Sequence, residues 1–374
     1  MTKVALLALA GQRNGGTLLY TRSMIEALTR LPRERYRFTL YTSDANHEYD
    51  DLGLPVVRLP GGPSIAASWL AGRDPFGDAD CVVAPIYSTI LLATRRRFAF
   101  TLHDLQEKHY PQYFSLATRA WRHLSNRLLS ARASRIICES NFVRSDIVAH
   151  FGVSASRIDV VPAPPISLLR DSRLDAEHLA AVRRKFDLPE CYVFYPAQFW
   201  PHKNHLRLVE AFVRVKRRFP DCALVLTGTQ RDEYERVFAR VRELGLGAQV
   251  RHIGYVEQAE LAALYRCATV AAIPTLFESI SIPVYEAFSV GTAVCASNVV
   301  ALPEQIGDAG LLFDPLSAED IAAAIERLLA DPALRQQLIE RGFRRIASVT
   351  QDGYALRLAG VIDSLAPPPR VALA

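Results

Sequence analysis

The sequence predicts an α/β protein built from two doubly wound, parallel-sheet domains. The chain has 374 residues, more than one ordinary hydrophobic core holds, and about 150 residues per domain points to two domains. Short apolar runs alternate with helical stretches in both halves, which is typical of a parallel sheet covered on both faces. The segment Val161-Pro162-Ala163-Pro164-Pro165 interrupts this alternation, because prolines lack a backbone donor and fix an extended path.

The N-terminal half opens with an apolar run at residues 4–10 that resembles a short signal peptide. Gln12 and Arg13 follow at once, and Gly15 and Gly16 then lead into a helical pattern, so a buried first strand followed by a helix is the better interpretation. Further short strands are expected at 37–41, 80–84, 97–102, 135–138 and 159–161.

The second half repeats the pattern after the proline segment, with a charged helix near residues 176–186 and a last helix over 350–365. Its strands are expected at 192–195, 223–227, 250–253, 270–273 and 293–296. We therefore expect a Rossmann-like domain over residues 1–165, a second over 166–349, and a C-terminal helix and tail over 350–374 that can cross back onto the first domain.

Composition narrows the class of protein. Half of the residues are hydrophobic and 22% are charged, which indicates a globular chain rather than a disordered or fibrous one. No apolar run approaches the roughly 20 residues that span a bilayer. The six cysteines are scattered without a C-x-x-C pair, so we expect a reduced cytoplasmic protein without a metal site.

Charge is uneven along the chain, since residues 1–166 hold 20 basic against 14 acidic side chains. This excess suits an anionic partner, such as a lipid surface or a diphosphate-bearing acceptor, or it is a solvated basic face. A basic helix in this half allows the same two interpretations, peripheral contact with an anionic membrane or a solvated face. Its residues include Arg119, Trp121, Arg122, Arg127 and Arg132. Nucleic acid is not an expected partner.

The most informative stretch runs from Pro274 to Phe288 as a strand end, a loop and a helix. Pro283 suits the first helical turn, because its missing N–H would be unpaired there. Backbone N–H groups at this positive end of the helix are a site for phosphate. Glu278 precedes that end and Glu286 lies about one turn inside it, so a diphosphate between them would place the donor sugar near Glu278 and the ribose near Glu286. The expected phosphate-binding residues are Ser279, Ile280, Ser281 and Ile282.

A second signal lies between Tyr195 and His205, where a strand ends, a polar loop follows and a helix begins. Lys203 stands at the junction of loop and helix. Ligands of open α/β sheets bind outside the carboxyl ends of the strands, so this lysine can meet a donor diphosphate, and Gln198 lies earlier in the same loop. The alternative is an exposed lysine at a helix start.

The N-terminal half carries two weaker signals. Gly15 and Gly16 follow the first strand. A glycine there either lets the backbone approach a phosphate or makes a plain turn. The surrounding residues do not form the pattern G-x-G-x-x-G, so a dinucleotide-binding site is not supported. His103 follows the strand at 97–102 and precedes Asp104, and a lone histidine there is either catalytic or structural.

Taken with their surroundings, the two glutamates and the lysine loop resemble the donor site of glycosyltransferase family 4, the group 1 glycosyltransferases, usually written E-x-F-G-x-x-x-x-E. Ser279-Ile280-Ser281 replaces the usual Gly-Phe-Gly. Many relatives carry an arginine earlier in the lysine loop, whereas this chain has Gln198 nearby. The Pro-His-Lys-Asn sequence ending at Asn204 leans toward GDP-mannose as the donor.

The resemblance implies a GT-B fold, two Rossmann-like domains facing across a cleft, and a metal-independent retaining transfer without a cofactor. A sugar would move from a nucleotide diphosphate to a hydroxyl of a glycan or lipid-linked glycan acceptor, as in cell-surface polysaccharide synthesis. It implies that Lys203 and Gly16 meet the diphosphate, that Glu278 binds sugar hydroxyls, and that His103 faces the donor sugar.

Three rival functions stay open on the sequence. An NAD-dependent nucleotide-sugar epimerase or dehydrogenase lacks its glycine fingerprint. A retaining glycoside hydrolase would hold two carboxylates about 5 Å apart around the scissile bond, but the glutamate pair here flanks an expected phosphate site. A non-catalytic nucleotide-binding protein of the same fold would bind nucleotide without turnover.

Overall fold

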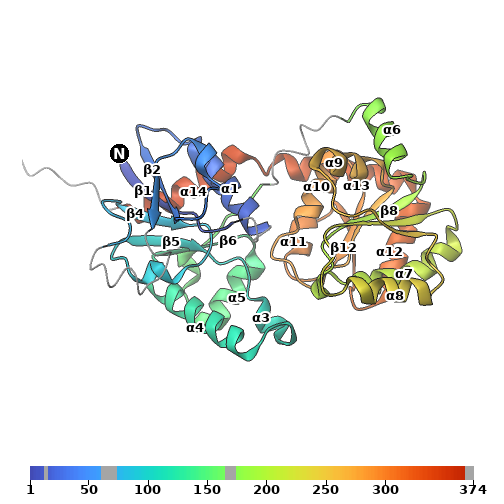
Figure 1. Ribbon diagram of the computed structural model, residues 1–374, viewed down its shortest axis with the longest axis horizontal. Helices are drawn as coiled ribbons and strands as arrows, with labels where there is room; N and C mark the ends of the chain where they lie inside the picture. The colour runs from blue at the N-terminus through green and yellow to red at the C-terminus, as the bar shows by residue number, and fades with distance from the viewer. Residues whose placement is uncertain (12–15, 60–73, 165–173, 367–374) are drawn as a thin grey trace, which may run out of the picture. The chain divides into compact units, whose positions relative to one another are not determined.

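The computed structural model describes residues 1–11, 16–59, 74–164 and 174–366. The chain forms two compact units, unit 1 from Met1–Pro164 with Val349–Ala374, and unit 2 from Pro165–Ser348. Each unit is a parallel sheet with helices on both faces (Figure 1), which confirms the predicted fold class. Gly15 lies outside the described residues, as does Pro165.

The sheet of unit 1 has seven strands among the described residues, in the order β3-β2-β1-β4-β5-β6-β7, and every neighbouring pair is parallel. Its strands are β1 (Thr2–Leu7), β2 (Tyr36–Ser43), β3 (Val56–Leu59), β4 (Cys81–Ala84), β5 (Arg97–Thr101), β6 (Arg135–Cys138) and β7 (Ile158–Val160). The apolar start of the chain is therefore an interior strand of this sheet, between β2 and β4. Alternate residues of β1 face two cores: Val4 and Leu6 face one, Ala5 and Leu7 the other.

Helices cover both faces of this sheet (Figure 1). One face carries α1 (Gly16–Thr29) and α14 (Gln351–Leu365), and the other carries α4 (Leu116–Arg132) and α5 (Asn141–Phe151), with the short α3 (Gln106–His109) beside them. Helix α14 contributes Tyr354, Leu358 and Ile362 to the core shared with α1. Asp363 of the same helix pairs with Arg35 at 2.6 Å. The last helix of the chain thus completes the first unit.

Unit 2 repeats the plan with a parallel sheet in the order β10-β9-β8-β11-β12-β13. Its strands are β8 (Tyr192–Pro196), β9 (Ala223–Thr227), β10 (Val250–His252), β11 (Val270–Ile273), β12 (Val294–Ser297) and β13 (Gly310–Phe313). Strand order reverses between β8 and β11, and such a switch point is where ligands bind in open α/β sheets. The two sequence motifs of this half follow these two strands.

Helices on one side of the unit 2 sheet are α7 (His205–Arg218), α8 (Tyr234–Glu243) and α12 (Ala318–Ala330), and those on the other include α9 (Gln258–Cys267), α10 (Ile282–Val290) and α13 (Pro332–Ala347) (Figure 1). Helices α6 (Ala176–Lys185) and α11 (Leu302–Ile306) complete the unit. Helix α10 ends at Gly291 in a left-handed conformation, φ 78°, which glycine adopts readily after a helix.

Two properties expected from composition can be read directly. All six cysteines are free thiols. Within the described ranges, we find no helix that combines the length and the apolar character needed to cross a bilayer.

Candidate active site

The lysine loop of unit 2 is a rigid turn at the carboxyl end of β8. A short 3-10 turn over Pro201–Lys203 leads into α7 through Asn204, which is left-handed with φ 60°. The Asn204 side-chain amide donates to the carbonyls of Pro274 and Pro315, each at 2.9 Å. Tyr195 donates its hydroxyl to the Lys203 carbonyl at 3.0 Å. These bonds fix the lysine against the loop that follows β11.

Lys203 and Glu278 meet at this point, although 75 residues separate them. Lys203 Nζ donates to Glu278 Oε1, and the two side chains are only 19% and 10% exposed. Glu278 Oε2 is buried and has no hydrogen-bond partner among the residues that the structure describes. A buried carboxylate oxygen without a donor is costly, so this atom is poised to accept a hydrogen bond from a ligand hydroxyl.

The start of α10 differs in one respect from the prediction of a row of free N–H groups. Ser281 donates its backbone N–H to Gln305 Oε1 at 2.8 Å, and Gln305 Nε2 donates back to the Ser281 carbonyl at 2.7 Å. The expectation that the Ser281 amide is free for phosphate is therefore wrong, because a buried N–H must be paired. The N–H groups of Ile280 and Ile282 have no acceptor among the described residues, so they remain available at this helix end.

Glu286 lies one turn into α10, partly buried, and accepts a hydrogen bond from the Tyr265 hydroxyl at 2.8 Å. Burial raises the pKa of Glu286 to about 7, and the Tyr265 bond works in the opposite direction. The site of unit 2 thus holds one carboxylate paired with a lysine and another that titrates near neutrality.

Gln198, the other predicted residue of the lysine loop, is also held in place. Its Oε1 accepts a hydrogen bond from Trp200 Nε1 at 2.9 Å. Its side-chain amide remains partly exposed beside the loop. Ser279 is likewise partly exposed, next to Glu278.

In unit 1, His103 follows β5 and pairs with Glu139, not with its neighbour Asp104. Its Nδ1 lies 2.9 Å from Glu139 Oε2 and its Nε2 lies 3.1 Å from the Pro85 carbonyl. The Pro85 carbonyl can only accept, so Nε2 donates to it, and the Glu139 carboxylate favours a hydrogen on Nδ1 as well, which is the charged form of the imidazole. Burial lowers the pKa of His103, but the Glu139 carboxylate outweighs this and raises it overall.

Asp104, the next residue along the chain, instead accepts a hydrogen bond from Arg122 at 3.0 Å. Sequence reasoning missed Glu139, which is 5% exposed and directly follows β6. A signal for it existed: β5 and β6 are neighbours in the sheet, so residues just past each strand meet at the same edge.

The glycine loop of unit 1 is described only at its ends. Gly16 begins α1 and is exposed, and a Cβ at this position would meet no atom within 4 Å. Nothing described in the chain therefore requires glycine here.

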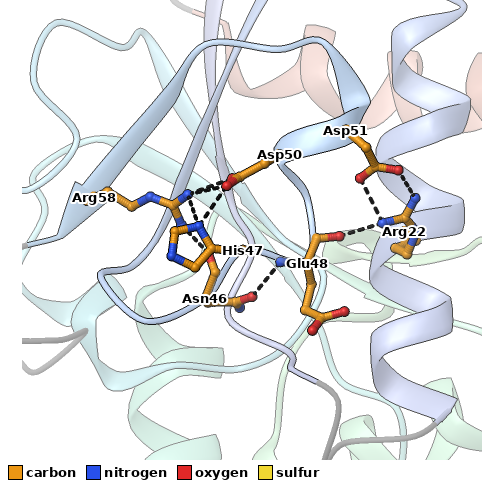
Figure 2. A network of polar contacts seen from close by, with 7 residues as sticks. All are labelled: Arg22, Asn46, His47, Glu48, Asp50, Asp51 and Arg58. Carbon is orange, nitrogen blue, oxygen red and sulfur yellow. Dashed lines mark hydrogen bonds and ion pairs between the residues drawn. The ribbon is translucent and has the colours of Figure 1, made fainter.

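A polar network around residues 46–51, next to α1, lies near this loop's other end (Figure 2). Arg22 of α1 holds Asp51 with bonds of 3.0 and 2.6 Å, and Arg58 holds Asp50 at 2.6 Å. Residues 46–49 of the same segment hold Ala10, which follows β1. Asn46 Nδ2 and the Tyr49 hydroxyl both donate to the Ala10 carbonyl, at 3.0 and 2.6 Å.

The basic helix α4 exposes large apolar side chains as well as arginines. Arg122 forms ion pairs with Asp104 and Glu107, at 3.0 and 2.9 Å, so its charge is already paired within unit 1. Large apolar side chains on the same helix are exposed: Leu116 at 78%, Trp121 at 56%, Leu124 at 52% and Leu128 at 46%. Positions 121, 124 and 128 lie on one face of a helix.

Comparison with known proteins assigns the chain to a family. The model of the glycosyl transferases group 1 matches residues 181–345, and the model of glycosyltransferase family 4 matches residues 15–164. The chain is 29% identical over 260 residues to O-antigen chain mannosyltransferase B of Escherichia coli, which covers 66% of this chain and 65% of that protein. It spans 25% to 65% of the length of four Escherichia coli mannosyltransferases that it matches.

Solved structures share the fold. Sucrose-phosphate synthase from Thermosynechococcus elongatus superposes with a TM-score of 0.77 at 22% identity, over 98% of this chain and 99% of that one. Anabaena HepE, in complex with UDP and glucose, gives 0.77 at 17% identity, over 97% and 100%. The two parallel-sheet units have the GT-B architecture of these neighbours. On these matches, the chain belongs to the group 1 glycosyltransferases of family 4.

Proposed function

We propose that this protein is a hexosyltransferase that moves a sugar, with retention of configuration, from a nucleotide diphosphate donor to a hydroxyl of a glycan or lipid-linked glycan. The observation that carries the proposal is the Lys203–Glu278 pair, whose second carboxylate oxygen is buried without a partner among the described residues. That oxygen suits a sugar hydroxyl, and the lysine suits a departing diphosphate. The likeness to an O-antigen chain mannosyltransferase supports mannose as the sugar and polysaccharide synthesis as the setting.

The proposed chemistry uses positioning and charge. The acceptor hydroxyl attacks the anomeric carbon from the face that the diphosphate leaves; the bond from that carbon to the phosphate oxygen breaks, and the hydroxyl proton passes to the diphosphate. Lys203 and the N–H groups of Ile280 and Ile282 stabilise the negative charge that develops, the kind of preorganised electrostatics that contributes most in many enzymes. Glu286 accepts from the ribose, and His103, whose two ring nitrogens are engaged by Glu139 and the Pro85 carbonyl, contributes positive charge rather than acting as a base.

No metal or other cofactor is part of this proposal, because a lysine and helix N–H groups supply the positive charge that a metal would otherwise bring. Transfer should therefore continue at the same rate in excess EDTA. A loss of activity in EDTA that Mg²⁺ or Mn²⁺ restores would contradict this part.

The decisive experiment begins with thermal unfolding in the presence of UDP, GDP, ADP and dTDP. A ligand at a hundredfold its dissociation constant adds about 2.7 kcal/mol to the free energy of unfolding. The matching nucleotide sugars are then tested for transfer, and NMR of the product gives the anomeric configuration. Binding without any turnover would make the protein a nucleotide-binding relative, and an inverted product would contradict retention. The structural neighbour HepE was solved with UDP, and the lysine loop leans toward GDP-mannose. UDP and GDP are therefore the first nucleotides to compare.

We also propose that α4 rests on an anionic membrane surface from the cytoplasmic side. The exposed Trp121, Leu124 and Leu128 would enter the interface, and exposed Arg127 would meet lipid phosphates, as in other interfacial amphipathic helices. Vesicles of phosphatidylglycerol should sediment the protein, and vesicles of phosphatidylcholine should not. The double substitution Trp121→Ser and Leu124→Ser should abolish sedimentation; equal sedimentation of this variant would contradict the proposal.

A further inference from the structure

Arg231 lies in the loop between β9 and α8 and is held by two residues of the lysine loop. Its guanidinium carbon lies 5.3 Å from the centroid of the Trp200 ring, which it covers. Its Nε lies 3.5 Å from Gln198 Oε1, the atom that also accepts from Trp200 Nε1. Stacking on an indole restricts the arginine without neutralising it.

The charge of Arg231 is uncompensated. The side chain is exposed, and no carboxylate forms an ion pair with it among the residues that the structure describes. Lys203 differs, since its ammonium is already paired with Glu278. A cation held in place by an aromatic ring and a neutral amide is free to pair with an anionic ligand.

Backbone contacts place the two loops side by side. Ala197 donates to the Thr227 carbonyl at 3.0 Å, and Glu233 donates to the Phe199 carbonyl at 3.1 Å. Gly228 permits this approach: a Cβ there would lie 2.5 Å from the Ala197 carbonyl oxygen, and its φ of 126° is one that other residues rarely adopt. Both loops follow strands of one parallel sheet, so they share the edge at which Lys203 stands.

We propose that Arg231 is the second cation of the donor site and binds the diphosphate together with Lys203; this rests on the proposed function. A diphosphate diester carries two negative charges, and one lysine that is shared with Glu278 does not balance them. Arginine offers a fork of N–H donors that matches phosphate oxygens. The neutral Gln198 holds this guanidinium at the lysine loop, so the neighbouring loop supplies the charge that the lysine loop itself lacks.

The test is calorimetric titration of the full chain with the nucleoside diphosphate that the wild type binds and with the corresponding nucleoside. Arg231→Gln should weaken diphosphate binding about tenfold or more, as expected for loss of one charged hydrogen bond, and leave nucleoside binding unchanged. Arg231→Lys should recover part of the loss. Since Arg231 is exposed, thermal unfolding without ligand should not change in either variant.

Arg236→Gln is the matched control, because Arg236 is an exposed arginine of the following helix that already pairs with Glu233 at 3.4 Å; it should bind as the wild type does. Unchanged diphosphate affinity in Arg231→Gln would overturn the inference, and so would an equal loss for diphosphate and nucleoside, which would assign Arg231 to the base. Failure of the wild type to bind any nucleoside diphosphate would instead contradict the proposed function.

Discussion

Lys203 and Glu278 depend on each other, because each is the main neutralising partner of the other in a largely buried place. Lys203→Met should slow transfer by about 10²-fold or more, since it removes a preorganised charge at the leaving group. It should also lower the free energy of unfolding by about 3 kcal/mol, because Glu278 is left charged and unpaired.

The control is a double-mutant cycle with Glu278→Gln, followed by urea unfolding and transfer rates. The double variant should regain part of the stability that Lys203→Met loses. Glu278→Gln alone should reduce turnover far more than nucleotide affinity. Strictly additive free energies of unfolding, or normal transfer by Lys203→Met, would show that the pair does not act as described.

Glu286 makes nucleotide binding depend on pH. Its pKa is raised to about 7 by burial, so folding favours the protonated form; this contribution to stability is present below the pKa of the unfolded chain, about 4.3, and is lost as pH rises through about 7. A ribose hydroxyl donates best to the ionised carboxylate. Nucleoside affinity should therefore rise between pH 6 and pH 8, with a midpoint near 7.

Titrations with a nucleoside avoid the ionisation of a terminal phosphate in the same range. Glu286→Gln should bind nucleoside more weakly at pH 8 and show a flat profile. A pH dependence that survives in this variant would assign the titration to another group.

At the scale of elements, a substitution at Gly16, the first residue of α1, should affect ligand binding without affecting the stability of the fold. Gly16→Ala places a methyl group where no atom lies within 4 Å, and alanine is a better helix former than glycine. The variant should fold with unchanged or slightly higher thermal stability, yet bind the nucleoside diphosphate about tenfold more weakly, as loss of one hydrogen bond to a charged group would cause. Gly360→Ala, in an equally open place inside α14, is the control: it should fold with unchanged or higher thermal stability and bind the nucleoside diphosphate as the wild type does.

The contact between His103, which follows β5, and Glu139, which follows β6, should contribute stability that depends on pH. The pKa of His103 is raised overall, so its charged form stabilises the fold; this contribution is complete below about pH 6.5, the unfolded value, and is lost as pH rises through the folded pKa. Glu139→Gln should lower the free energy of unfolding by about 1–3 kcal/mol at pH 6, and by less at pH 9. Asp104 also raises the pKa of His103, but less than Glu139 does, so Asp104→Asn should show a weaker pH dependence; a stronger one than in Glu139→Gln would mean that the partner of His103 is misassigned.

At the scale of the whole molecule, the C-terminal helix α14 belongs to the same unit as the N-terminal strands, since it packs on α1 and the central strands of unit 1. Leu358 is 1% exposed in that core, whereas Leu356 of the same helix is 70% exposed. Leu358→Ala should cost about 2–5 kcal/mol in urea unfolding, and Leu356→Ala should cost within about 0.5 kcal/mol. Equal effects of the two substitutions would mean that α14 does not complete the core of unit 1.

The sequence by itself determined the fold class and most of its strands, because parallel strands buried on both faces are short continuous apolar runs bounded by helices. It missed β3 and β13, the strands at one edge of each sheet. Both are four-residue runs at a sheet edge, and their residues are mostly only partly buried. An arginine interrupts the apolar run of β3, whereas β13 was missed although Gly310–Phe313 is apolar. The proline-started helix with its two glutamates and the lysine loop could also be read from local chemistry alone.

Only the tertiary structure decided which of these residues meet. Lys203 and Glu278 form an ion pair, and Gln305 accepts a hydrogen bond from the Ser281 backbone N–H. Arg231 contacts Gln198 of the lysine loop. These contacts join residues between 24 and 75 positions apart, and no local pattern encodes them. Strand order is the physical reason: it brings together the carboxyl ends of strands that are distant along the chain, and with them the side chains that follow.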